Sequence, residues 1–79
     1  MSELNLPRVI DARQMMPPEP MEATLAALDD LPPGGEILLL LYREPFPLYG
    51  ILRDNGYTHS TRLEADGTFE ITIRHAAQP

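Results

Sequence analysis

Two segments of the chain combine arginine with acidic and proline residues, and the second also contains two aromatic residues, a set that can bind a small anion. Residues 11–21 read Asp-Ala-Arg-Gln-Met-Met-Pro-Pro-Glu-Pro-Met, and residues 43–49 read Arg-Glu-Pro-Phe-Pro-Leu-Tyr. Guanidinium groups bind carboxylates and oxyanions through paired hydrogen bonds, and the amino end of a helix attracts negative charge. Because each segment leads into a predicted helix, we predict a site for a small anionic ligand or for a carboxylate of a protein partner.

The predicted binding residues lie in or beside these two turns. They are Asp11, Arg13, Met16, Pro18, Glu19, Pro20, Arg43, Glu44 and Tyr49. A structural interpretation competes with the functional one. In it, Asp11 and Arg13 tie down the first turn, and Arg43 pairs with Glu44 across the loops. The residue types alone do not separate the two.

Apolar side chains of the same segments also allow two interpretations each. Met15 and Met16 form either an adaptable contact surface or a plug in the core beneath the first helix. Phe46 is predicted to be a hydrophobic staple ahead of the second helix, unless it joins Tyr49 in an apolar wall beside the arginines. The competing prediction for Tyr49 is a half-buried ring with its hydroxyl in water.

Neither a catalytic group nor a metal site is recognisable in the sequence. The chain contains no cysteine, so it has no thiolate nucleophile and no thiolate metal ligand. His59 and His75 have no partner at ligand spacing, and the side chains of His59 and Ser60 point to opposite faces of a predicted strand. We therefore expect a protein that is not an enzyme and that uses no metal or other cofactor.

Charge and hydropathy exclude several classes of partner. The net charge is −6, all six basic residues are arginine, and no basic run occurs, so binding to nucleic acid or to an anionic membrane surface is not expected. The longest apolar run, residues 37–42, is far shorter than the roughly 20 residues of a membrane span. No signal-peptide pattern opens the sequence, and a cytoplasmic location is expected.

The first half of the chain predicts a strand, a helix and a second strand. Residues 8–11 are short and β-branched, as in a strand. A helix follows the first proline-rich turn, with an inward stripe formed by Met21, Leu25, Leu28 and Leu31. Residues 36–42 form an almost unbroken apolar run, which is typical of a central strand.

The second half predicts one helix and a pair of strands. The helix spans residues 46–55, with Gly56 as its left-handed cap, and Gly50 inside it is attributed to close packing on the sheet. Residues 58–63 and 69–74 are predicted strands, joined by an Asp-Gly hairpin turn. The last strand alternates apolar and polar residues strictly, as expected when one of its faces is buried.

The resulting order is βαβαββ. Two helices can cover one face of a sheet, so we predict an α+β fold, a two-layer sandwich with two helices on one face of a four-stranded mixed sheet. Residues 1–79 form one domain with an ordered core of about residues 6–75 and frayed ends. Parallel pairing of the first two strands would bring both helix starts to one edge, where open α/β sheets bind ligands. A strand edge left open would permit a homodimer.

The motifs of residues 11–21 and 43–49 resemble those of a known family. A strand ending in Asp-Ala, followed by the Pro-x-Pro of Pro18-Glu19-Pro20, is similar to the TusA/SirA-like sulfur carriers, although Pro17 occupies the position of their cysteine. Residues 43–49 resemble the Arg-Glu-Pro-x-Pro-Leu-Tyr segment of cysteine-less relatives, a bacterial family of unknown function. The resemblance covers nearly the whole chain and implies a sheet in which the last strand alone is antiparallel.

The resemblance implies recognition rather than reaction, because the sulfur atom of the carrier family is missing. We expect a non-catalytic binding or adaptor domain. Relatives of this kind occur near genes of nitrogen-oxide respiration or fused to redox-related domains, which implies an accessory role in redox metabolism. The alternative is an accessory role in persulfide transfer that uses a cysteine of a partner protein.

Overall fold

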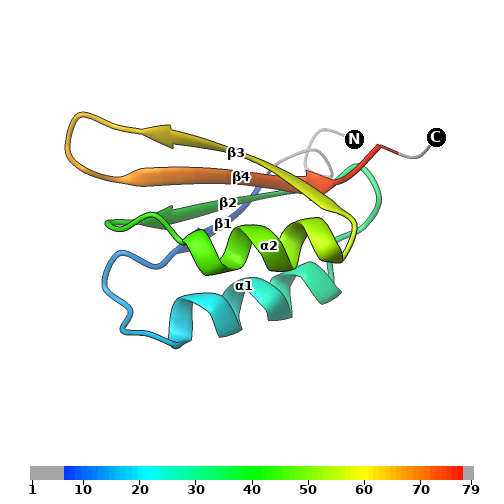
Figure 1. Cartoon of the computed structure of the whole chain (residues 1–79), viewed down its shortest axis with the longest axis horizontal. Coiled ribbons are helices and arrows are strands. Elements are labelled where there is room, and N and C mark those ends of the chain that lie inside the picture. Colours follow the sequence, from blue (N-terminus) through cyan, green and yellow to red (C-terminus); the bar gives the residue numbers. More distant parts are fainter. Residues whose placement is uncertain (1–6, 78–79) are drawn as a thin grey trace.

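The computed structural model describes residues 7–77, which form two helices and a four-stranded sheet (Figure 1). The elements in chain order are β1 (Arg8–Asp11), α1 (Glu19–Asp29), β2 (Glu36–Leu41), α2 (Phe46–Asp54), β3 (Tyr57–Leu63) and β4 (Phe69–His75). Both helices lie on the same face of the sheet, which gives two layers. The predicted α+β sandwich and its βαβαββ order are therefore confirmed.

The sheet has the strand order β1-β2-β4-β3. β1 and β2 pair in parallel, with Val9 aligned to Leu38 and Asp11 to Leu40. β4 lies between β2 and β3 and runs antiparallel to both. The last strand is thus internal, and β1 and β2 both end at the edge where the helices begin, as the sequence predicted.

The core lies between the sheet and the helices. β2 alternates between buried and half-buried side chains, so one set of its leucines faces the helices. The buried apolar side chains are Ala12, Ala27, Leu28, Ile37, Leu39, Leu41, Leu48, Leu52, Ile71 and Ile73. Burial of this apolar set is the main favourable contribution to folding in a chain without disulfides.

The predicted inward stripe of helix α1 is confirmed at Leu28, which is buried, and at Met21 and Leu31, which pack against the core, but it is wrong at Leu25. The buried residues of α1 are Thr24, Ala27 and Leu28, whereas Leu25 is 36% exposed. The hydroxyl of Thr24 donates a hydrogen bond of 2.8 Å to the carbonyl of Pro20, so this buried polar group is satisfied within the helix. The small residues Thr24 and Ala27, at 0% and 1% exposure, are therefore buried where the larger Leu25 is not.

The predicted role of Gly50 is wrong, while two other glycine predictions are confirmed. A Cβ at Gly50 would meet one described neighbour, the guanidinium of Arg53 at 3.6 Å, and no strand. Gly56 and Gly67 have φ values of +85° and +92°, in the left-handed region that favours glycine at a helix end and in a hairpin turn.

The predicted fraying at residues 1–5 lies outside the described residues. At the other end, where residues 76–79 are predicted to fray, the N–H of Ala76 donates a hydrogen bond of 2.8 Å to the carbonyl of Gly56, and residues 78–79 lie outside the described residues. No helix within residues 7–77 has the length and apolar character needed to cross a bilayer.

Candidate functional site

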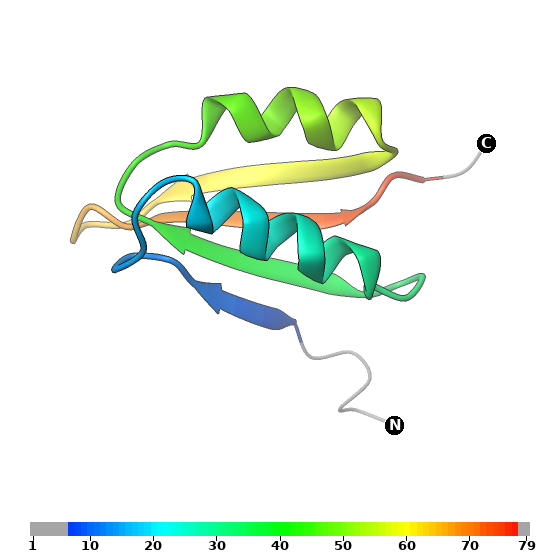
Figure 2. The ribbon, with the colours of Figure 1, turned by 90° about the horizontal axis from the view of Figure 1, so that it is seen from below.

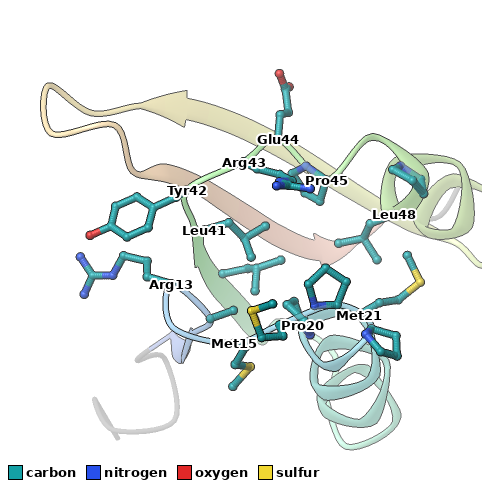
Figure 3. Close-up of a pocket in the computed structure, with 16 residues that line it drawn as sticks. Arg13, Met15, Pro20, Met21, Leu41, Tyr42, Arg43, Glu44, Pro45 and Leu48 are labelled. Carbon is teal, nitrogen blue, oxygen red and sulfur yellow. The ribbon is translucent and has the colours of Figure 1, made fainter.

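A groove of about 640 Å³ lies at the end of the molecule where β1 and β2 stop and both helices begin (Figure 3). Its lining is dominated by proline, methionine and leucine. The lining residues are Ala12, Arg13, Met15, Met16, Pro17, Pro18, Pro20, Met21, Leu39, Leu41, Tyr42, Arg43, Glu44, Pro45, Pro47 and Leu48. The two segments selected from the sequence therefore meet at one site, although they are far apart in the chain.

The floor of the groove is continuous with the core. Leu39, Leu41 and Leu48 are buried core residues whose side chains also line the groove. At the rim, Met16 is 74% exposed and Tyr42 is 54% exposed. A core-like floor below an exposed apolar rim is the form that ligand and partner sites commonly take.

The structure separates the alternatives left open for the apolar residues of the two turns. Met15 packs against the core, as predicted for a plug, and Met16 lies on the surface, where it is available for contact. The two predicted roles therefore belong to different methionines. The predicted staple is wrong, because Phe46 is the first residue of α2 and is 67% exposed. Its ring meets that of Tyr49 edge to face, with centroids 6.0 Å apart.

Arg13 is held by Asp11, as the structural interpretation proposed. Its Nε and Nη2 atoms donate to the Asp11 carboxylate at 2.9 and 2.8 Å, and its backbone N–H donates at 3.2 Å. These hydrogen bonds lower the pKa of Asp11 to about 2 and raise that of Arg13. In Figure 3 the guanidinium points away from Leu41 and the groove floor. The charge of Arg13 is thus already neutralised by a neighbour.

The predicted pairing of Arg43 with Glu44 is absent from the ion pairs within residues 7–77. Glu44 instead accepts a hydrogen bond of 3.0 Å from the Tyr49 hydroxyl, and its side chain points away from the groove (Figure 3). Arg43 therefore lines the groove with a positive charge that no described carboxylate neutralises.

Of the two interpretations left open for Tyr49, the half-buried ring is found, but its hydroxyl has protein partners. Besides Glu44, the hydroxyl contacts Thr61 Oγ1 at 2.7 Å, and the ring stacks on His59 with a centroid distance of 4.1 Å. Burial raises the pKa of Tyr49, the hydrogen bond with Thr61 opposes this shift, and the Glu44 carboxylate adds to it. Tyr49 thus ties the turn before α2 to β3 and binds the carboxylate of Glu44.

Six of the nine predicted binding residues line the groove, namely Arg13, Met16, Pro18, Pro20, Arg43 and Glu44. Asp11, Glu19 and Tyr49 lie outside its lining. The sequence interpretation missed Tyr42, which it assigned to the end of a strand, and the leucines of the floor, which it assigned only to the core. An apolar residue that directly follows a buried strand and precedes a proline-rich turn was the available signal for Tyr42.

Residues 9–75, which include both groove segments and most of every strand and helix, match a sequence family described as "Uncharacterized conserved protein (DUF2249)". The chain belongs to the DUF2249 family. No curated protein and no solved structure matched it. The function of this DUF2249 domain must therefore be argued from its groove.

The helix starts of the DUF2249 domain offer few donors to an anion. At α1 the N–H groups of Glu19 and Glu22 donate to carbonyls of the preceding turn at 2.9 and 3.1 Å. At α2 the N–H groups of Phe46 and Leu48 do the same at 3.0 and 2.9 Å. The second residue of each helix is a proline, which has no N–H. Arg43 is therefore the main polar group available to an anionic ligand in the groove.

The histidines of the DUF2249 domain have structural contacts. His59 stacks on Tyr49, and Nε2 of His75 lies 2.9 Å from the carbonyl oxygen of Leu31. Within residues 7–77 no three His, Cys, Asp or Glu side chains come together in an arrangement that could hold a metal ion.

Proposed function

We propose that this DUF2249 domain is a non-catalytic binding or adaptor module whose groove receives an apolar group of a protein partner or of a small anionic ligand. The observation that carries the proposal is the groove itself, in which core leucines form the floor and Met16 and Tyr42 are exposed at the rim. Methionine and proline give such a surface little polar character, and methionine adapts its shape to different partners.

Arg43 determines which polar group the proposed ligand must carry. A carboxylate or another anionic group beside the apolar part of the ligand would pair with this guanidinium. The net charge of −6 opposes the approach of strongly acidic partners. The proposed ligand is therefore mainly apolar and carries a single local negative charge.

The resemblance to TusA/SirA-like sulfur carriers supports the same proposal. A strand that ends at Asp11 and Ala12, a Pro-x-Pro that opens α1, and a sheet whose last strand runs antiparallel agree with that scaffold. Within this proposal the domain is cytoplasmic and accessory to redox or nitrogen-oxide metabolism, and a homodimer stays a prediction.

The second candidate function is an accessory role in persulfide transfer. One observation favours it: Pro17, at the position of the carrier family's cysteine, lines the groove, where the cysteine of a partner could lie. The test combines pull-down with sulfur-relay enzymes and a transfer-rate assay. An absence of acceleration at saturating protein excludes this function.

The groove proposal is tested with anilinonaphthalene sulfonate, a fluorescent probe that joins an apolar ring system to one anionic group. We expect Arg43→Ala to weaken probe binding about tenfold, by loss of a charge-assisted hydrogen bond. Met16→Ser should weaken it about threefold by loss of apolar contact. Arg53→Ala is the matched control, because Arg53 is exposed on α2 outside the groove.

Circular dichroism checks that each variant keeps its fold, since this probe also binds partly unfolded protein. Arg13→Ala should have a smaller effect on binding than Arg43→Ala, because Asp11 already neutralises Arg13. Probe binding that is unchanged in the Arg43 and Met16 variants would refute the groove as the site.

A further inference from the structure

A second hollow lies at the other end of the two helices. This hollow has a volume of about 350 Å³ and is lined by Leu25, Leu28, Asp29, Ile51, Asn55 and Tyr57. Tyr57 reaches it from β3, and its hydroxyl donates a hydrogen bond of 3.4 Å to the carbonyl of Leu28. The hollow therefore lies between the carboxyl ends of α1 and α2 and is closed below by the first residue of β3.

One helical turn separates the two hollows on each helix. Met21 lines the groove and Leu25 lines the second hollow, four residues further along α1. On α2, Leu48 lines the groove, and Ile51, three residues further along, lines the second hollow. Residues at these spacings are neighbours on one helix face, and the helices run side by side in the same direction (Figures 1 and 2). The groove and the second hollow thus lie one after the other along the surface between the two helices, and we call this surface the interhelical furrow.

The two ends of the furrow carry opposite charges. Arg43 lies at the end where both helices begin, and Asp29 lies at the end where they finish. The helix dipoles have the same polarity as these side chains, positive at the start and negative at the finish. An occupant with a positive end at Asp29 and a negative end at Arg43 complements the whole furrow.

The furrow walls also restrict the backbone of an occupant. Helices present side chains and no free strand edge, so an extended segment lying between them would leave its own N–H and C=O groups unpaired against apolar residues. A helix satisfies these groups internally. With about 1.5 Å per residue, the 11 residues of α1 extend for about 16 Å, which corresponds to about three turns of an occupying helix.

We propose that the interhelical furrow binds one amphipathic helix of a partner protein, oriented antiparallel to α1 and α2. Its positive amino end lies at Asp29, its negative carboxyl end lies at Arg43, and its apolar residues contact Leu25, Ile51 and the groove. This inference rests on the proposed function and names the class of partner. It also explains why Leu25, which lies at a core spacing in the sequence, is exposed in the structure.

The test uses random displayed peptides of about 14 residues, long enough for about four helical turns, selected on the purified domain. We expect enriched peptides to space apolar residues by three and four positions, with basic residues towards the amino end and acidic residues towards the carboxyl end. Leu25→Gln keeps a helix-forming residue. It should lower the affinity for an enriched peptide, measured by fluorescence anisotropy, about fivefold.

Val9→Thr is the matched control. Val9 is also an exposed apolar residue, at 55%, but it aligns with Leu38 on the sheet face that carries no helix. It should leave peptide affinity unchanged.

Three outcomes would overturn the inference. Apolar residues enriched at alternate positions would indicate an extended occupant, and the reverse order of charges would refute the orientation. A peptide whose affinity falls with Met16→Ser but not with Leu25→Gln would bind in the groove alone. The proposed function would then stand, and the proposed binding of a partner helix would be refuted. Failure to enrich any peptide also excludes the binding of a partner helix. Binding of the sulfonate probe then tests separately whether the groove is a binding site.

Discussion

Replacing Tyr49 by phenylalanine removes one hydroxyl and the two hydrogen bonds that join the turn before α2 to β3. A phenol has one proton, and the Glu44 carboxylate can only accept, so Tyr49 donates to Glu44 and receives the proton of Thr61. A hydrogen bond to a charged group contributes about 1.5–3 kcal/mol when buried. Since this hydroxyl is only part-buried, we expect the two bonds together to contribute about 1 kcal/mol.

A loss of about 1 kcal/mol should lower the midpoint of thermal unfolding by about 4–8 °C in a domain of this size. Urea unfolding and a calorimetric scan of Tyr49→Phe both measure it. Tyr42→Phe is the matched control, because the Tyr42 side chain is 54% exposed and its hydroxyl has no hydrogen bond within residues 7–77. Equal stabilities of the two phenylalanine variants would refute the assigned role of Tyr49.

A double-mutant cycle with Thr61→Val separates the two hydrogen bonds. Valine has the shape of threonine but cannot donate, so the single variant should lose the Thr61–Tyr49 bond alone. We expect the cost of Thr61→Val to disappear in the background of Tyr49→Phe, because the acceptor is then missing. Additive costs would show that the two hydroxyls do not interact in solution.

Two further predictions concern stability. Arg13 holds the pKa of Asp11 at about 2, below its ordinary value, so the stabilisation by this carboxylate is complete above about pH 4 and is lost as the pH falls towards 2. Asp11→Asn should therefore flatten the dependence of unfolding free energy on pH in this range, and an unchanged slope would contradict the pairing. Gly50→Ala should raise the unfolding free energy by about 0.5–1 kcal/mol, because a Cβ there meets one flexible guanidinium and glycine is costly inside a helix. A destabilised alanine variant would show that the backbone needs the glycine.

The order of elements could be predicted because the sequence marks it with residues of strong local preference. Prolines at the second position of both helices, Gly56 at a helix end and Gly67 in a hairpin each restrict the backbone in a way that depends little on the rest of the fold. The strict alternation of β4 sets which of its faces is buried.

The exposure of Leu25 and the burial of Thr24 on α1 could not be predicted, because they depend on tertiary packing. Leu25 fits a helical stripe as well as Leu28 does, and periodicity ranks a leucine above a threonine as a core residue. In the structure the smaller Thr24 is fully buried, and its hydroxyl is satisfied by the carbonyl of Pro20 within the same helix. The periodicity of the sequence does not show which of two neighbouring helix positions is buried.

Only some of the side-chain partners in the site could be predicted, because the others also depend on tertiary packing. Asp11 and Arg13 are two residues apart at a turn, so their pairing is a local event that the sequence can indicate. The partner of Glu44 is Tyr49, five residues along and one helical turn into α2, and Tyr49 in turn contacts Thr61 on β3. That network exists only once α2 has packed beside β3, and neighbouring residues in the sequence do not reveal it.

The apolar rim of the groove is not required by the fold. Met16 and Tyr42 are 74% and 54% exposed, so most of their surface adds nothing to the burial that stabilises the core. In a domain this small, exposed apolar side chains gathered at one end favour self-association and give no compensating stability. Their position beside a guanidinium without a described partner, over a floor of core leucines, therefore finds its physical reason in recognition of another molecule.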